Sequence, residues 1–257
     1  MNPETATILE KYQKYFENPE FIENDPISIP HKFSKKEDIE IAGFLSATIA
    51  WGNRKAIINS CNNMIERMDY APYDFIINAN NRDISVLNGF YYRTFQECDI
   101  FYFIQSLSNI YRNRAGMEEI FLKGYNSSDT DKIKHAISYF REVFFETEFP
   151  QRVTKHVANP MKGAAAKRIN MFLRWMVRSN DKGIDFGIWK NISPADLIIP
   201  LDVHVGNTAR ELGLFNSNAN NWNAAEIVTN ELKTLDNNDP VKYDFALFGI
   251  SNSKIIL

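Results

Sequence analysis

Apolar residues recur along this chain at intervals of three and four, and this spacing constrains the fold more than any other feature. One clear case is the run Ile100, Phe103, Ile104, Leu107 and Tyr111. Spacing of this kind places apolar side chains on one face of a helix, whereas a half-buried strand alternates them with a period of two. Long alternation of that second kind is absent from the sequence. The pattern predicts an all-α fold.

Helix starts are also marked in the sequence. Ser34 followed by Glu37 has the form of a capping box before the apolar run 39–50, and Ser193 with Pro194 has the form of an N-cap followed by a favoured first-turn proline. Gly, Pro and Asn clusters interrupt the helical patterns without forming a separable linker. We therefore expect helices joined by short connections.

Composition excludes several classes of protein. The two cysteines, Cys61 and Cys98, are too few for a disulfide framework or for a four-thiolate metal site. Neither a signal-peptide pattern nor an apolar stretch of membrane-spanning length is present, so we expect a cytoplasmic protein that does not enter a membrane. A chain of 257 residues with 44% apolar content can form one large domain or two smaller lobes.

Positive charge is concentrated in one window, although the formal net charge of the chain is −3. Between residues 151 and 180 there is no Asp or Glu, and the basic residues are Arg152, Lys155, Lys162, Lys167, Arg168, Arg174 and Arg178. A charge run of this kind is most often a solvated surface. A clustered basic face is also typical of a nucleic-acid binder, and charge alone leaves both interpretations open.

The basic window contains a glycine turn that leads into a helix. Residues 159–168 read Asn-Pro-Met-Lys-Gly-Ala-Ala-Ala-Lys-Arg, and an amphipathic helical pattern follows over 169–177. Helical spacing puts Lys167, Met171, Arg174 and Arg178 on one face, which we call the basic stripe. Cations beside the free N–H groups of a helix start favour phosphate binding. An ordinary surface helix preceded by a turn is the alternative.

A second candidate position follows 35 residues after Lys167. Asp202 lies at the end of an apolar approach, residues 198–201, and just before a helical pattern. Asp is a preferred N-cap, so a capping role is the simplest interpretation. His204 two residues later raises a further alternative, a metal-assisted hydrolase that uses Asp202 and His204 with His156 or His31, although this spacing is a weak ligand signature.

Together these segments resemble the active-site region of the helix-hairpin-helix (HhH-GPD) DNA glycosylase superfamily, which includes endonuclease III and the archaeal-type 8-oxoguanine DNA glycosylases. In the latter group a Lys-Gly turn, a catalytic lysine and a Phe-Leu-Arg helix follow in series. The corresponding residues here are Lys162-Gly163, Lys167 and Phe172-Leu173-Arg174. Leu201-Asp202 with His204 is similar to the aspartate-containing strip of the superfamily, and Ala165 stands at the second hairpin glycine.

The resemblance extends beyond this region. Residues 44–47 and 53–56 are similar to the helix-loop-helix in which the superfamily places a DNA-intercalating side chain. Across its whole length the chain resembles a bacterial family of conserved hypothetical proteins in which residues 200–205 and 242–249 recur. This closer resemblance implies no activity.

The superfamily resemblance implies a two-lobed helical fold, with a central lobe over 36–160 and a second lobe formed by 1–35 and 161–257. It implies a base-excision repair enzyme that removes a damaged base, with oxidised bases among the candidates, from duplex DNA after flipping the nucleotide out of the helix. Lys167 would be the nucleophile of a bifunctional glycosylase with AP-lyase activity, and Asp202 its catalytic carboxylate. No metal or organic cofactor is implied, and we expect a monomer.

The resemblance also implies two further sets of residues. Those expected to contact DNA are Lys162, Gly163, Ala164, Ala165, Arg168, Arg174, Asn53 and Arg54. Those expected at the base pocket are Trp51, Trp175 and His204. The additional segment 179–193 is expected to be an inserted loop with Trp189 as an aromatic anchor, which either edges the pocket or packs against the helix.

Two other functions stay open at this point. A monofunctional glycosylase or a non-catalytic DNA-binding protein would keep the same fold, with Lys167 limited to phosphate contact. A helical interaction module would instead use the basic window to bind an acidic partner.

Overall fold

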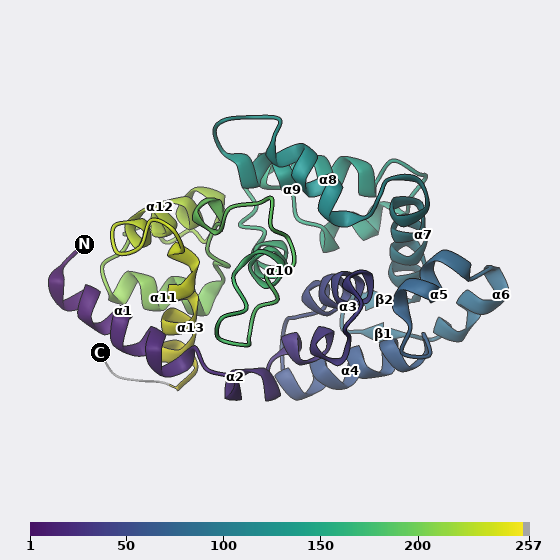
Figure 1. The fold of residues 1–257 in the computed structure, drawn as a ribbon, viewed down its shortest axis with the longest axis horizontal. Coiled ribbons are helices and arrows are strands. Elements are labelled where there is room, and N and C mark those ends of the chain that lie inside the picture. The colour runs from purple at the N-terminus through teal and green to yellow at the C-terminus, as the bar shows by residue number, and fades with distance from the viewer. Residues whose placement is uncertain (254–257) are drawn as a thin grey trace. The chain divides into compact units, whose positions relative to one another are not determined.

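The computed structural model describes residues 1–253 and is mostly helical, as the apolar spacing predicts (Figure 1). Within these residues the single sheet pairs strand β1 (Tyr91–Tyr92) with β2 (Phe95–Gln96) in antiparallel register. The chain divides into two compact units. We call the first, Met1–Phe21 with the chain from Asn159 onward, the terminal unit, and the second, Ile22–Ala158, the central unit.

The terminal unit is discontinuous in sequence. Its α-helices are α1 (Pro3–Phe16), α10 (Lys167–Val177), α11 (Val203–Glu211), α12 (Trp222–Lys233) and α13 (Asp244–Ser253). Its 3-10 turns are η5 (Pro160–Lys162), η6 (Pro194–Asp196) and η7 (Pro240–Tyr243). The sequence-based division assigned residues 22–35 to this lobe, whereas they group with the central unit here.

The central unit contains the sheet and most of the helices. Its α-helices are α3 (Lys36–Thr48), α4 (Arg54–Glu66), α5 (Pro72–Asn78), α6 (Asn81–Ile84), α7 (Glu97–Asn113), α8 (Met117–Tyr125) and α9 (Lys132–Phe144). Its 3-10 turns are η1 (Pro26–Ser28), η2 (Pro30–Lys32), η3 (Ser85–Leu87) and η4 (Gln151–His156). The short helix α2 (Glu20–Glu23) spans the boundary with the terminal unit.

Side-chain caps fix the starts of several helices. Asn53 begins α4 and Asn221 begins α12, each accepting a hydrogen bond from a backbone N–H in the first turn. The capping box expected at Ser34 is wrong, because α3 begins at Lys36 and its N-cap, Lys35, makes no such bond. Ser193 does cap the following segment, but Pro194 opens only the three-residue turn η6.

The core of the terminal unit forms where α1 packs along α13 (Figure 1). Gly249 on α13 permits this approach, because a Cβ at that position would lie 2.1 Å from the Phe16 ring. Leu9 of α1 and Leu247 of α13 are fully buried in the same apolar cluster. The packing of α1 and α13 thus joins segments from opposite parts of the sequence, which lets residues of α1 reach the site described below.

The core of the central unit is aromatic. Phe44 of α3 packs against Phe103, Phe140 and Phe144 with ring centroids 5.3 to 5.8 Å apart. Apolar spacing in the sequence assigned Phe103 to the inner face of α7, and the structure confirms its burial. Over residues 1–253, no helix combines the length and apolar character that crossing a membrane requires.

Candidate functional site

The glycine turn that precedes α10 has a defined backbone. After η5, Gly163 adopts a left-handed conformation with φ of 82°, and its carbonyl accepts a 3.0 Å hydrogen bond from Trp222 N at the start of α12. Ala164 forms an isolated antiparallel bridge with Asn221. A Cβ at Gly163 would meet no atom within 4 Å, so this exposed turn is open to approach from outside. This backbone pairing therefore ties the turn to the start of α12.

Ala165 does not take over the conformation of the glycine that it replaces in the resemblance. The second left-handed residue is Ala166, with φ of 50°, and Ala165 has no positive φ. Asn170, buried one turn into α10, donates from Nδ2 to the Ala165 carbonyl at 3.1 Å. This bond fixes the entry to α10, and it was not predicted because Asn170 lies within an ordinary helical pattern.

Ala166→Gly should raise the free energy of unfolding by up to about 1 kcal/mol, because left-handed backbone is unfavourable for alanine and free of strain for glycine. Ala164→Gly is the matched control. Its φ is not positive, so glycine there should be neutral or destabilising by about 0.5–1 kcal/mol. Urea denaturation measures both, and equal effects of the two changes would contradict the strain at Ala166.

Lys167 and Asp202 meet at the N-terminal end of α10. Lys167 Nζ lies 3.6 Å from Asp202 Oδ2, and each side chain is about one quarter exposed, at 25% and 26%. Asp202 is the N-cap of α11, and its Oδ1 accepts from the backbone N–H groups of His204 at 2.9 Å and Val205 at 3.0 Å. One carboxylate oxygen is thus used by the helix cap while the other faces the amine.

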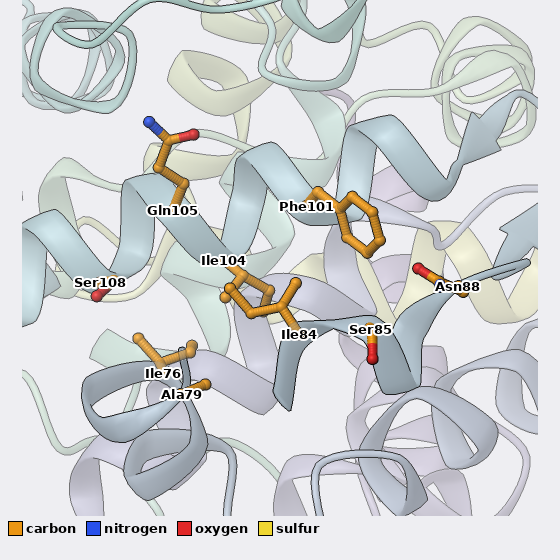
Figure 2. Close-up of a pocket in the computed structure, with 9 residues that line it drawn as sticks. All are labelled: Ile76, Ala79, Ile84, Ser85, Asn88, Phe101, Ile104, Gln105 and Ser108. Atoms are coloured by element: carbon orange, nitrogen blue, oxygen red, sulfur yellow. The ribbon is translucent and has the colours of Figure 1, made fainter. Parts of the chain in front are cut away.

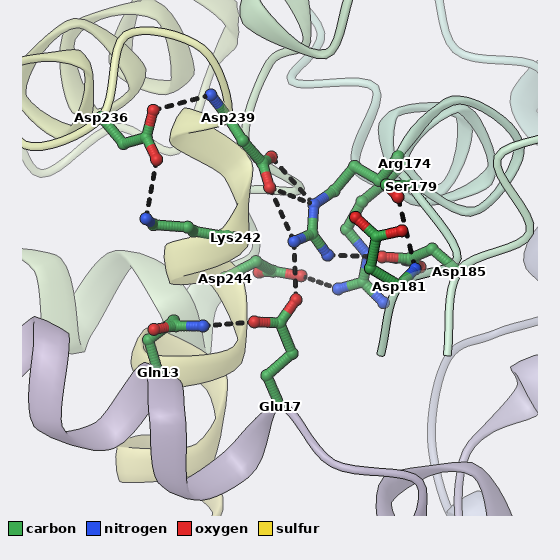
Figure 3. A network of polar contacts seen from close by, with 11 residues as sticks. Gln13, Glu17, Arg174, Ser179, Asp181, Asp185, Asp236, Asp239, Lys242 and Asp244 are labelled. Atoms are coloured by element: carbon green, nitrogen blue, oxygen red, sulfur yellow. Dashed lines mark hydrogen bonds and ion pairs between the residues drawn. The ribbon is translucent and has the colours of Figure 1, made fainter. Parts of the chain in front are cut away.

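Two arginines of the basic stripe are buried, contrary to the expected phosphate-binding face. Arg174 is 3% exposed and Arg178 is 5% exposed. Arg174 pairs through Nη1 with Asp244 and through Nε, at 3.4 Å, with Asp185 (Figure 3). A buried arginine whose charge is neutralised by two carboxylates is not available to a DNA phosphate, so the sequence-based assignment of Arg174 to DNA contact is corrected here.

Arg178 is the centre of what we call the buried ion network, which consists of Glu17, Arg174, Arg178, Asp185, Asp239 and Asp244 (Figure 3). Its guanidinium donates to Asp239 at 2.8 and 2.9 Å, to Asp185 at 2.5 Å and to Glu17, the C-cap residue of α1, at 2.6 Å. Hydrogen bonds to Asp239 and the charges of all three carboxylates raise the pKa of Arg178, against the opposing effect of burial.

Asp244, the first residue of α13, is a buried carboxylate beside the Lys167–Asp202 pair. The pKa of Asp244 is raised to about 6, mainly by burial; the charges of Arg174 and Lys167 oppose this rise, and the charge of Asp202 adds to it. Because this pKa lies above the unfolded value of about 3.9, the stability contributed by the protonated form is lost as the pH rises through about 6. Residues 242–249 recur in the family that the sequence resembles, but this recurrence assigned no role to Asp244.

The inserted segment 179–193 packs against α10. Trp189 is fully buried, with its ring 5.4 Å from Phe172 in an edge-on arrangement. The segment also pairs with the end of the helix, because Phe186 N donates to the Trp175 carbonyl and Trp189 N to the Met176 carbonyl. Asp185 comes from this segment, so the insertion supplies a carboxylate to the buried ion network. Of the two expected roles, packing is the one observed.

The remaining predicted residues of the terminal unit divide by exposure. Lys162, Gly163 and His204 are exposed, and Ala164 and Ala165 are half-buried. Arg168 is half-buried, and burial lowers the pKa of its guanidinium to about 10. Trp175 has no exposed surface, so its side chain belongs to the core and does not line an open base pocket as expected.

Three predicted residues belong to the central unit. Asn53 is the exposed N-cap of α4, and Arg54 follows it as the first residue of that helix. Trp51 is half-buried, edge-on to Tyr92 at 5.5 Å, and its carbonyl accepts from the Tyr92 hydroxyl at 2.6 Å. The exposed Asn53 turn and the partly open Trp51 ring leave these positions accessible.

The basic window is not one continuous surface. Arg152 lies in the central unit and pairs at 3.2 Å with the buried carboxylate of Asp99. Arg174 and Arg178 are buried, and the lysines Lys155 and Lys162 are exposed. The positive charge that remains open to solvent at the turn therefore comes mainly from Lys162 and Lys167.

A cavity of about 460 Å³ occurs in the central unit between α5, η3 and α7 (Figure 2). Ile76, Phe101 and Ile104 contribute its apolar surface, and Ser85 and Gln105 add polar groups. All of its lining residues are uncharged, so this cavity offers hydroxyl and amide groups but no carboxylate, amine or imidazole. A lysine and an aspartate within ion-pair distance of each other lie instead at the turn before α10.

The metal-hydrolase alternative gains no cluster of ligands. Among the described residues, no group of three or more His, Cys, Asp or Glu side chains is arranged to hold a metal ion. The His204 side chain is exposed, and its backbone N–H donates to the Asp202 carboxylate. Asp202 and His204 therefore form the capped start of α11.

Comparison with known proteins gives one match. A family model with the description "Protein of unknown function (DUF2400)" matches residues 25–253. No curated protein and no solved structure matches the chain.

Proposed function

Because this chain belongs to the DUF2400 family, whose description names no activity, we propose a function from the site itself: a DNA glycosylase of base-excision repair, with associated AP-lyase activity. The observation that carries the proposal is the approach of Lys167 Nζ to within 3.6 Å of Asp202 Oδ2 at a helix start beside an open glycine turn. An amine and a carboxylate in this arrangement are the two groups that such a reaction requires.

The two side chains have complementary roles. A lysine attacks carbon only as the neutral amine, and a carboxylate within ion-pair distance can assist the removal of its proton. The Lys167 amine would then form a bond to the sugar C1′ as the bond to the damaged base breaks and the base leaves with the bonding electrons. Ring opening gives a Schiff base between Lys167 and the sugar, and β-elimination then cleaves the strand on the 3′ side.

The geometry of Asp202 supports this assignment. Its Oδ1 is fixed by two backbone N–H groups, so the carboxylate keeps one orientation and Oδ2 stays directed at the amine. A preorganised negative charge stabilises the positive charge that develops on the sugar ring as the base departs. An N-cap and a catalytic carboxylate are therefore compatible roles for one side chain.

The turn before α10 supports a duplex DNA partner. Gly163 is exposed with open space around its Cα, and the exposed Lys162 precedes it. Backbone N–H groups at a turn and helix start, with lysines beside them, bind phosphate without reading sequence. Contacts of this kind would hold the DNA strand against Lys167 and Asp202.

A monofunctional glycosylase is the second candidate, and the same ion pair supports it. An ion pair at 3.6 Å stabilises the ammonium form of Lys167, which binds phosphate but does not attack carbon. Asp202 would then direct a water molecule to C1′. The covalent intermediate distinguishes this candidate from the first.

Incubation with duplexes that contain 8-oxoguanine, oxidised pyrimidines, hypoxanthine, uracil or alkylated purines tests the proposal, with undamaged duplex as the control. We expect release of at least one base, and a covalent protein–DNA complex when borohydride is present to reduce the Schiff base. Base release without a covalent complex selects the monofunctional enzyme. No base release from any duplex would refute glycosylase activity.

A further inference from the structure

The basic stripe of α10 connects the exposed pair to the buried ion network. Lys167 lies at the partly exposed start of the helix, and Arg174 lies about two turns further along the same face, in the core. Asp244 pairs with Arg174 from the first residue of α13, and α13 packs against α11, whose N-cap is Asp202. Through Arg174, Asp244 is thus tied to α10, the helix that begins at Lys167, and α13 is packed on α11, the helix that Asp202 caps.

The charged groups that influence the pKa of Asp244 lie on α10 and at the start of α11. After burial and the charge of Arg174, the strongest influences on Asp244 are the charges of Lys167 and Asp202, so the four groups are electrostatically close. Arg174 is shared with Asp185 of the inserted segment. The next shell, centred on Arg178, contributes Asp185, Asp239 and Glu17. Taken together, the buried ion network contains four carboxylates and two guanidinium groups, so it is net negative.

We propose that Asp244 is a positioning residue of the proposed glycosylase site, whose buried negative charge, held by Arg174, stabilises the positive charge that forms on the sugar beside Lys167 and Asp202. The inference rests on the proposed function. Asp244 is buried and paired with Arg174, so its effect would be transmitted by its electric field and by the balance of charge at the Lys167–Asp202 pair.

Burial is what makes such an effect significant. Charges in the protein interior interact more strongly than exposed charges, because less water screens them. Asp244 is 6% exposed, whereas Asp202 is about one quarter exposed and uses one oxygen in the helix cap. The buried carboxylate of Asp244 therefore adds its negative charge to that of Asp202 in stabilising a positive charge on the sugar.

The charge on Asp244 depends on pH in a range that an experiment can reach. With its pKa raised to about 6, Asp244 is ionised at neutral pH and becomes neutral as the pH falls through that value. The stabilisation of a positive charge at the sugar should therefore grow as the pH rises through about 6. His204 is exposed and lies two residues from Asp202, so a variant that lacks its imidazole serves as a control.

Binding of two abasic analogues measures this stabilisation without turnover. One duplex contains a pyrrolidine, which is cationic at the sugar position, and the other contains an uncharged tetrahydrofuran. For the unsubstituted protein, the preference for the cationic duplex should rise with pH through about 6. Asp244→Asn should lower this preference about five- to tenfold at neutral pH, as expected for the loss of one nearby charge, and should remove its pH dependence.

Matched variants separate this role from a structural one. Asp239→Asn removes another carboxylate of the buried ion network, on the Arg178 side, and should lower stability without changing the preference or its pH dependence. His204→Gln should also leave the pH dependence in place. If Asp244→Asn does not fold, His204→Gln and Asp239→Asn still test the inference. The preference for the cationic duplex should keep its pH dependence in both variants.

Three outcomes would overturn the inference. The first is a preference for the cationic duplex that does not change with pH although both duplexes bind, which leaves the proposed function standing. The second is an equal loss of preference in Asp239→Asn and Asp244→Asn. The third is the failure of either abasic duplex to bind more tightly than undamaged DNA, which contradicts the proposed function as well.

Discussion

Lys167→Gln should abolish the borohydride-trapped complex with damaged DNA, because glutamine has no amine to form a Schiff base. Asp202→Asn should keep the cap geometry, since the amide oxygen can accept the bonds from His204 and Val205, but it removes the negative charge 3.6 Å from the amine. We expect this change to lower the single-turnover rate of base release by about 10²- to 10⁴-fold.

Lys162→Gln is the matched control for Lys167→Gln. Lys162 is an exposed lysine of the same turn, five residues before Lys167. Its loss should weaken DNA binding and reduce the salt dependence of that binding, while the covalent complex still forms. A complex that persists in Lys167→Gln would show that Lys167 is not the nucleophile. Base release that is lost in Asp202→Asn but retained in Lys167→Gln would favour the monofunctional enzyme.

Arg178→Met should lower the free energy of unfolding by about 3–5 kcal/mol, the usual cost of removing one partner from a buried ion pair. Methionine fills part of the volume of the arginine, so the main effect comes from leaving Glu17, Asp185 and Asp239 without their shared cation. Urea denaturation followed by circular dichroism measures the change.

Lys242→Met is the matched control for that experiment. Lys242 also makes an ion pair in the terminal unit, at 2.7 Å from Asp236, but both side chains are partly exposed. Its loss should cost about 1 kcal/mol or less, since exposed ion pairs contribute little. Similar losses for the two variants would contradict the view that the Arg178 contacts depend on burial.

Local features of the site were predictable from sequence because they depend on near neighbours. The turn at Gly163 and the helix after it follow from a glycine next to an amphipathic pattern, and the role of Asp202 as an N-cap follows from residue preferences at helix starts. The all-α class follows from apolar spacing in the same way. Each of these predictions needs information from only a few adjacent positions.

The burial of Arg174 and Arg178 was not predictable, because the carboxylates that pair with these two arginines are distant in sequence. Asp244 is 70 residues from Arg174, and Glu17 is 161 residues from Arg178. A window without acidic residues therefore looked like an exposed basic face, although the neutralising carboxylates come from α1, α13 and the inserted segment. Charge patterning describes a surface only when no distant segment covers it.

The position of α1 in the terminal unit affects how the protein is made. In a growing chain α1 leaves the ribosome before the central unit, but α13, against which it packs, follows the whole central unit. Domains generally fold as units during synthesis, so the central unit can fold while the apolar face of α1 and the carboxylate of Glu17 still lack their partners. The Lys167–Asp202 site, which depends on α10, α11 and α13, therefore forms only after the central unit has been synthesised, and a chain that stops before α13 does not carry the complete site.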